Sequence, residues 1–230
     1  MTVQTDAVMT SAAFMTPRQP KTNAASADTR QRLIDAAAIQ FAERGFENVT
    51  VREICKASNA NVAAVNYHFG DKAGLYRAVV THAIAVMQDT NEQSQRAGDG
   101  QSPEDQIRGF VRVFVGRLAA NDNPSAWISK LMAREMEHPT DALDQVMQQV
   151  LQPRLEYLCG VAAAYMRLPV TDPRVKRCIV SLQVQCFLAS RRIPPSMEKA
   201  WGPVMRDVDV AIDHIVEFTL GGMRAIAAAQ

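Results

Sequence analysis

The sequence predicts an all-α protein: an N-terminal three-helix unit of the helix-turn-helix kind, followed by a larger helical domain. Apolar residues recur at the helical spacing along most of the chain, and no segment shows the strict alternation of a half-buried strand. Turn residues and prolines separate the periodic segments. We therefore divide the chain into a flexible tail (1–27), a first helical unit (28–77) and a larger helical domain (78–230).

The first helix is predicted to begin near Asp28 and to end at Gly45. Residues 1–27 are rich in Thr, Ala, Ser, Gln and Pro and show no periodicity, which is typical of a mobile tail. After them, apolar side chains recur three and four positions apart, as on one face of a helix. These residues are Leu33, Ile34, Ala37, Ala38, Phe41 and Ala42.

A second, short helix is predicted from the capping pattern Thr50-x-x-Glu53. A hydroxyl at the N-cap and a carboxylate three residues later satisfy unpaired amides at a helix start. The helix should end near Ala57, since the sequence then turns polar. Asn59 is suited to a left-handed turn conformation, and Asn61 to the N-cap of the next helix.

A third helix is predicted from Val62 to about Phe69, with a break at Gly70. Asp71 then caps a fourth helix that starts at Lys72. Three helices with a tight turn between the second and the third, within roughly 40 residues, are the outline of a helix-turn-helix unit.

Composition and charge exclude several classes of protein. Apolar residues make up 47% of the chain, which excludes general disorder, and the net charge of +1 excludes a wholly basic nucleic-acid coat protein.

The cysteines form no CxxC pair and the histidines are scattered, so we expect no metal site. No catalytic motif is present, and we expect neither an enzyme nor a cofactor. Without a signal peptide or a membrane-length apolar run, a cytoplasmic protein with no membrane partner is expected.

The segment Thr29–Val80 resembles the DNA-binding domain of the TetR family of transcriptional regulators. The matching landmarks are Ile34, Ala37, Ala38, Phe41 and Gly45-Phe46 for the first helix, residues 50–54 for the second, and His68-Phe69, Lys72 and Leu75 around the start of the fourth. Residues 58–61 depart from the family's usual turn. Asn66 stands where many members have a Tyr, with Tyr67 one place later, so either residue could supply that contact.

The remainder more weakly resembles the regulatory half of the CecR-like branch of that family, through residues 131–136 followed by Pro139-Thr140. The resemblance implies a homodimer with a DNA-binding domain (28–77) and a ligand-binding and dimerisation domain (78–230). Members usually repress transcription and release DNA when a small molecule binds. The branch hints at control of efflux and drug tolerance.

The candidate DNA contacts lie at the second, third and fourth helices. Short side chains at the start of the third helix would let it enter the major groove, and Asn66 is suited to adenine recognition. Tyr67 and His68 are better suited to phosphates, although His68 could equally pack within the domain, and surface Asn is common. The full set is Thr50, Arg52, Asn61, Val62, Ala63, Ala64, Asn66, Tyr67, His68 and Lys72.

The second domain contains side chains suited to a ligand pocket and to a dimer interface. Apolar residues with a few polar groups suggest a pocket at Trp127, Met132, Arg134, Glu135, Met136, Tyr165, Met166, Gln183 and Phe187, although such Met-rich stripes are more often core. The two C-terminal helices suggest a four-helix interface at Ile179, Leu182, Cys186, Ile212, Ile215, Phe218 and Gly222, with packing inside one subunit as the alternative.

These observations favour a homodimeric DNA-binding regulator, most simply a repressor released from a palindromic operator by a small-molecule effector. Residues 28–77 carry seven basic and six acidic side chains. Because this balance is near neutral, an alternative interpretation is a helical small-molecule-binding protein whose DNA-binding domain no longer binds DNA. A transcriptional activator and an enzyme that uses the cavity between the helices are further alternatives.

Overall fold

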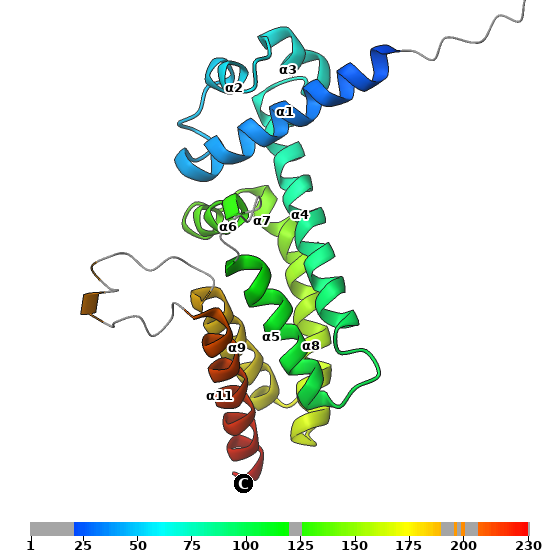
Figure 1. Cartoon of the computed structure of the whole chain (residues 1–230), viewed down its shortest axis with the longest axis vertical. Coiled ribbons are helices and arrows are strands. Elements are labelled where there is room, and N and C mark those ends of the chain that lie inside the picture. Colours follow the sequence, from blue (N-terminus) through cyan, green and yellow to red (C-terminus); the bar gives the residue numbers. More distant parts are fainter. Residues whose placement is uncertain (1–20, 120–125, 190–195, 197–198, 201–206, 230) are drawn as a thin grey trace, which may run out of the picture.

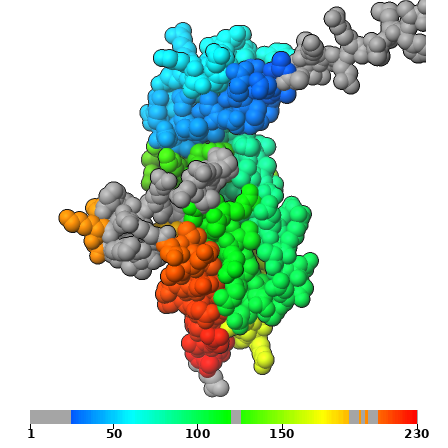
Figure 2. All heavy atoms as spheres, in the orientation of Figure 1, coloured from blue at the N-terminus to red at the C-terminus, as the bar shows by residue number. Residues whose placement is uncertain are grey.

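The computed structural model describes residues 21–119, 126–189, 196, 199–200 and 207–229. These residues form helices and turns without any strand, which confirms the predicted all-α class. At one end of the molecule lie α1 (Lys21–Arg44), α2 (Val51–Ala57) and α3 (Val62–Phe69), and the C-terminus lies at the other end (Figure 1). In the space-filling view α1–α3 form the upper lobe (Figure 2).

A lower bundle of long helices continues from this lobe. α4 (Lys72–Arg96) connects the two, because it begins beside α3 and runs down along the bundle (Figure 1). The shorter helices α6 and α7 lie between the lobe and the bundle. The remaining elements are α5 (Pro103–Ala119), α6 (Ala126–Glu137), α7 (Asp141–Val146), the π-helical turn η1 (Met147–Leu151), α8 (Gln152–Met166), α9 (Pro173–Ala189) and α11 (Val208–Ala228).

α1 begins seven residues earlier than the sequence predicts, at Lys21 rather than near Asp28. Apolar periodicity gives no signal there, because residues 25–32, whose burial is described, are all exposed or half-buried. The added turns contain several alanines, the best helix former, and the hydroxyl of Thr29 donates to the carbonyl of Ala25 at 2.9 Å. The rest of the predicted tail, residues 1–20, lies outside the described residues.

The predicted helix ends around the tight turn are confirmed. Thr50 and Glu53 form the capping box of α2, and Asn61 caps α3 by accepting from the backbone of Ala64. Asn59 has φ 50°, the left-handed conformation that the turn requires. Asp71 caps α4 by accepting from the amide of Gly74 at 2.6 Å.

The buried apolar residues form two clusters. The upper one joins α1–α4 with residues of α6, α7 and η1, including Ile128, Leu131 and Val146. The lower one joins α5, α8, α9 and α11. Residues 128–151 therefore pack with the N-terminal helices although they lie far along the chain. No helix in the described ranges has the length and apolar character needed to cross a membrane.

Candidate nucleic-acid interface and ligand cavity

One face of α3 is free of contacts with the rest of the lobe. Val62, Ala63, Asn66 and Tyr67 are exposed and lie on this face, and Tyr67 has 81% of its surface accessible. Val65 points the opposite way and is fully buried. Small side chains at the start of the helix, followed by an amide and a phenol, suit a helix that enters the major groove.

The other predicted contacts of α3 lie at the edges of this face. Ala64 and His68 are half-buried, and Ala64 packs against the upper core. The His68 ring lies between the rings of Tyr67 and Phe69, at centroid distances of 4.9 and 5.9 Å. The carbonyl oxygen of the Asn61 side chain is occupied in the cap, which leaves its amide nitrogen to donate.

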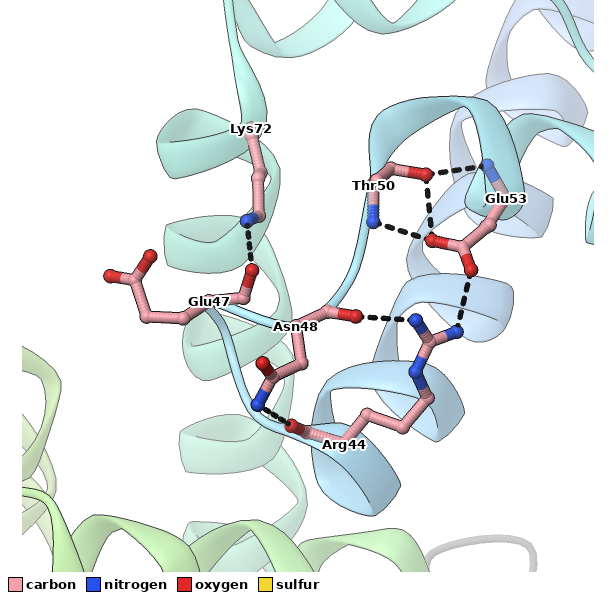
Figure 3. A network of polar contacts seen from close by, with 6 residues as sticks. All are labelled: Arg44, Glu47, Asn48, Thr50, Glu53 and Lys72. Carbon is pink, nitrogen blue, oxygen red and sulfur yellow. Dashed lines mark hydrogen bonds and ion pairs between the residues drawn. The ribbon is translucent and has the colours of Figure 1, made fainter.

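The start of α2 is held by an ion pair as well as by its capping box (Figure 3). The backbone N–H of Thr50 and its hydroxyl donate to Glu53 at 2.8 and 2.6 Å, and Arg44 donates to the same carboxylate at 2.8 Å. These bonds lower the pKa of Glu53 to about 2, and the bond from Arg44 contributes most to this shift. Arg52 projects freely from this helix start.

Lys72 and Arg44 hold the loop before α2 from two sides (Figure 3). Nζ of Lys72 donates to the carbonyl of Glu47 at 3.4 Å and lies 4.4 Å from the centre of the Phe46 ring. Arg44 donates to the carbonyl of Asn48. The ammonium group of Lys72 thus lies at the first turn of α4, where a helix N-terminus favours anions.

Two residues that support the lobe, one at the tight turn and one at the α3–α4 junction, were not found by sequence reasoning. Arg32 of α1 donates to the carbonyls of Ser58 and Asn59, at 2.7 and 3.4 Å, and so fixes the tight turn. At Gly74 an added Cβ would lie 1.9 Å from the carbonyl oxygen of Phe69. The close approach of α3 to α4 therefore requires glycine. The contacts of Arg32 join residues 26 and 27 positions apart, so no local sequence signal reveals them.

A cavity of about 310 Å³ lies between α4, α5, α6, α7, η1, α8 and α9. Its volume is at the lower end of the range for small-molecule sites. Eleven of its fifteen lining residues are apolar. The lining consists of Met87, Thr90, Phe114, Leu118, Ile128, Ser129, Met132, Met136, Leu143, Leu151, Arg154, Val180, Gln183, Val184 and Phe187.

Four of the predicted pocket residues line this cavity, namely Met132, Met136, Gln183 and Phe187. The other five do not. The ring of Trp127 stacks on His82 with centroids 5.9 Å apart. The Tyr165 hydroxyl accepts from Arg224 on α11, and Met166 is buried in the lower core. The remaining two, Arg134 and Glu135, connect α6 to other helices.

Arg134 and Glu135 are adjacent and point to different helices. Nε of Arg134 donates to the carbonyl of Ala42 at the end of α1, at 2.9 Å. Glu135, only 2% exposed, accepts from the hydroxyl of Tyr76 on α4 and from the backbone and hydroxyl of Thr140. Burial and the bond to this carboxylate raise the pKa of Tyr76. α6 therefore contacts the cavity with one side and α1 and α4 with the others.

The cavity wall also includes a π-helical turn that the sequence did not predict. Pro153, one residue into α8, has no N–H to offer the carbonyl of Gln149. Side chains of α4 donate to the carbonyls at this point: Gln88 to Gln149 at 3.3 Å, and Asn91 to Val150 at 3.2 Å. Such turns are frequent at functional sites. This one contains Leu151, and Arg154 follows it in α8; both residues line the cavity.

Most of the predicted dimer-interface residues lie inside one subunit. Ile179, Leu182, Cys186, Ile212 and Ile215 are at most 2% exposed and belong to the lower core, so they cannot contact a second copy. Helical spacing identified an apolar face but not its partner. Of the predicted set, Phe218 is 63% exposed and Gly222 half-buried. The exposed apolar residues of these helices are instead Val180, Val184, Leu188, Val210, Phe218 and Ile226.

α9 begins and ends within one residue of its predicted limits, and α11 ends at the predicted residue, Ala228. The sequence predicts them over about Arg174–Ser190 and Pro203–Ala228, and the structure has α9 over Pro173–Ala189 and α11 over Val208–Ala228. Asp207 caps α11 by accepting from the amides of two following residues. The predicted start at Pro203 falls outside the described residues.

Comparison with known proteins gives two family matches. The model for the C-terminal domain of the HTH-type transcriptional dual regulator CecR matches residues 103–223, and the model for bacterial regulatory proteins of the tetR family matches residues 33–79. The chain is 30% identical to CecR of Shigella flexneri over 156 residues, which cover 64% of this chain and 68% of that protein. It is also 30% identical to the probable acrEF/envCD operon repressor of Escherichia coli K12, over 42% of each chain.

The crystal structure of a TetR-like transcriptional regulator from Rhodococcus sp. RHA1 has the same fold. Its TM-score is 0.62 at 20% identity, and the match covers 88% of this chain and 96% of that one. The family matches point to a helix-turn-helix transcriptional regulator. The chain belongs to the TetR family, in its CecR-like branch.

Proposed function

We propose that this regulator is a homodimeric repressor that binds a palindromic operator through α3 and releases it when a small molecule enters the cavity. The exposed face of α3 carries the proposal. Four of its side chains project from a helix that is locked at both ends, by the Asn61 cap and by the close α3–α4 junction. A rigid recognition helix is what base readout in the major groove requires.

The contacts to DNA divide into two kinds. Asn66 and the small residues Val62, Ala63 and Ala64 would meet base edges, while Tyr67 and His68 would contact phosphates. Lys72 would exchange its contact with the loop carbonyl for a phosphate. Thr50 and Arg52 would reach the DNA backbone or an edge base, and Asn61 would add a further contact.

Two helices connect the cavity to the DNA-binding domain (28–77). α6 lines the cavity through Met132 and Met136 and holds α1 and α4 through Arg134 and Glu135. α4 lines it through Met87 and Thr90 and begins beside the recognition helix. A ligand that moves α6 or the cavity end of α4 would shift the DNA-binding lobe. Such a ligand would bind the DNA-bound and the released conformations with different affinity, and so couple the cavity to the operator.

The second domain (78–230) would also form the dimer. Exposed apolar side chains such as Val184 and Leu188 of α9 and Phe218 of α11 lie on helices that contact each other. Packing this face against its copy would bury it in a two-fold interface. The resemblance to the CecR-like branch suggests efflux and drug-tolerance genes as targets, and a similar protein is a probable repressor of the acrEF/envCD operon.

Selection of bound sequences from a random duplex pool, at fixed salt, tests this function. We expect enrichment of a two-fold-symmetric site whose half-sites lie about 34–36 Å apart, one helical turn. No enrichment by the folded, ligand-free protein would contradict operator binding and favour the alternative of a small-molecule-binding protein. A reporter gene under the selected site distinguishes repression from activation.

A further inference from the structure

A buried arginine lies in the wall of the cavity. Arg154 is 6% exposed and lines a space whose other lining residues are apolar or neutral. Burial lowers the pKa of its guanidinium to about 10, so the group still carries a positive charge at neutral pH. A charge held out of water is costly unless it is paired and hydrogen-bonded.

No partner for this charge is found in the part of the chain that the structure describes. Nε of Arg154 is a buried nitrogen without a hydrogen-bond partner, and no described carboxylate affects the pKa of the guanidinium. Cys186 lies nearby, but burial raises its pKa to about 12, so its thiol stays neutral. The ring of Phe114, 4.9 Å from the Cζ atom, offers only a partial compensation.

A second unpaired donor lines the same cavity. The amide nitrogen of Gln183 is buried and has no hydrogen-bond partner among the described residues. Glu135, the other charged side chain that is buried in the described ranges, is by contrast surrounded by three donors. A buried charge in this interior can therefore be fully paired, whereas Arg154 and Gln183 both line the cavity and each has an unpaired donor.

We propose that the ligand of this cavity is an amphipathic anion: a small molecule with one carboxylate on an apolar body. The carboxylate would accept hydrogen bonds from Arg154 and Gln183, and the apolar body would contact the Met, Leu, Val and Phe side chains of the wall. A guanidinium presents a fork of donors that matches a carboxylate. The inference rests on the proposed effector role of the cavity, since it names the chemistry of that same ligand.

Matched pairs of probes test the charge of the ligand. Decanoate and decanamide, and 4-phenylbutyrate and 4-phenylbutyramide, differ within each pair in the carboxylate alone. Isothermal titration calorimetry with the full chain at pH 7, without DNA, gives their affinities. We expect at least one carboxylate to bind about 10- to 100-fold more tightly than its amide, as expected for hydrogen bonds to a charged group.

Variants locate this preference at the buried arginine. Arg154→Met keeps an unbranched apolar chain and should remove the preference, while Arg154→Lys should retain part of it, because an ammonium lacks the fork. Gln183→Leu should weaken carboxylate binding by about 3- to 10-fold. The control is Arg112→Met on α5, whose guanidinium is exposed, and it should leave both affinities unchanged.

Stability without ligand separates a binding role from a structural one. Because the charge of Arg154 is unpaired, Arg154→Met should fold with an apparent Tm equal to or above that of the wild type. A fall of more than about 4 °C would show that Arg154 supports the fold, and would overturn the assignment. Equal binding of acid and amide for both pairs, or an unchanged preference in Arg154→Met, would also overturn it.

The same probes in a DNA-binding assay distinguish this inference from the proposed function. If a carboxylate binds in an Arg154-dependent manner but leaves the DNA affinity unchanged, the ligand class stands and the effector role fails. If only the amides release DNA, the effector role stands and the anionic ligand is wrong.

Discussion

The buried contact between Tyr76 and Glu135 should be measurable as a coupling energy between α4 and α6. Tyr76→Phe removes the hydroxyl that donates to the carboxylate, but leaves the two donors of Thr140 in place. A hydrogen bond to a charged group contributes about 1.5–3 kcal/mol, so we expect a loss of that size in the free energy of unfolding. Glu135→Leu should cost at least as much, because it removes the acceptor of the Tyr76 hydroxyl and of the two Thr140 donors.

The double variant, Tyr76→Phe with Glu135→Leu, should cost less than the sum of the two single changes. The difference, about 1.5–3 kcal/mol, is the coupling energy of the contact. Urea unfolding followed by circular dichroism, at one protein concentration, gives these values. Tyr165→Phe is the matched control, since its hydroxyl accepts only from Arg224 at the surface, and it should change stability by less than about 0.5 kcal/mol. Additive costs in the double variant would refute the contact.

Four further changes test the DNA-binding lobe. Lys72→Ala should weaken binding to all duplexes alike and reduce the salt dependence of binding. Asn66→Ala should instead relax the preference at one base position. Equal losses of affinity on every sequence for Asn66→Ala would contradict base reading. Glu53→Gln should be less stable than the wild type at pH 6. Because folding lowers the pKa of this carboxyl to about 2, the difference should vanish as the pH falls from about 4.5 to 2, and a constant difference would argue against the ion pair. Gly74→Ala should lower the free energy of unfolding by about 1–3 kcal/mol, since its Cβ would clash with a backbone oxygen. In the control Gly116→Ala the added Cβ meets no atom within 4 Å, so this change should be neutral or stabilising. Urea unfolding measures both.

The sequence by itself predicted the features whose physics is local. A capping box joins residues three positions apart, so Thr50 and Glu53 specify the start of α2 without any other part of the chain. The same holds for the Asn61 and Asp71 caps and for the left-handed turn at Asn59. The helix-turn-helix outline and the order of the exposed residues on α3 follow from these short-range signals and from helical periodicity.

The tertiary structure decided which helix faces which. Ile179 and Ile212 had the spacing of an apolar face, but only packing showed that this face is filled by their own subunit. Arg134 and Glu135 had the residue types of a pocket, yet crossing helices direct them to α1 and α4. Arg154 had no sequence signal as a ligand contact, because a charged residue is expected at the surface. Its role depends on burial, which the chain acquires only when seven separate elements pack around a cavity.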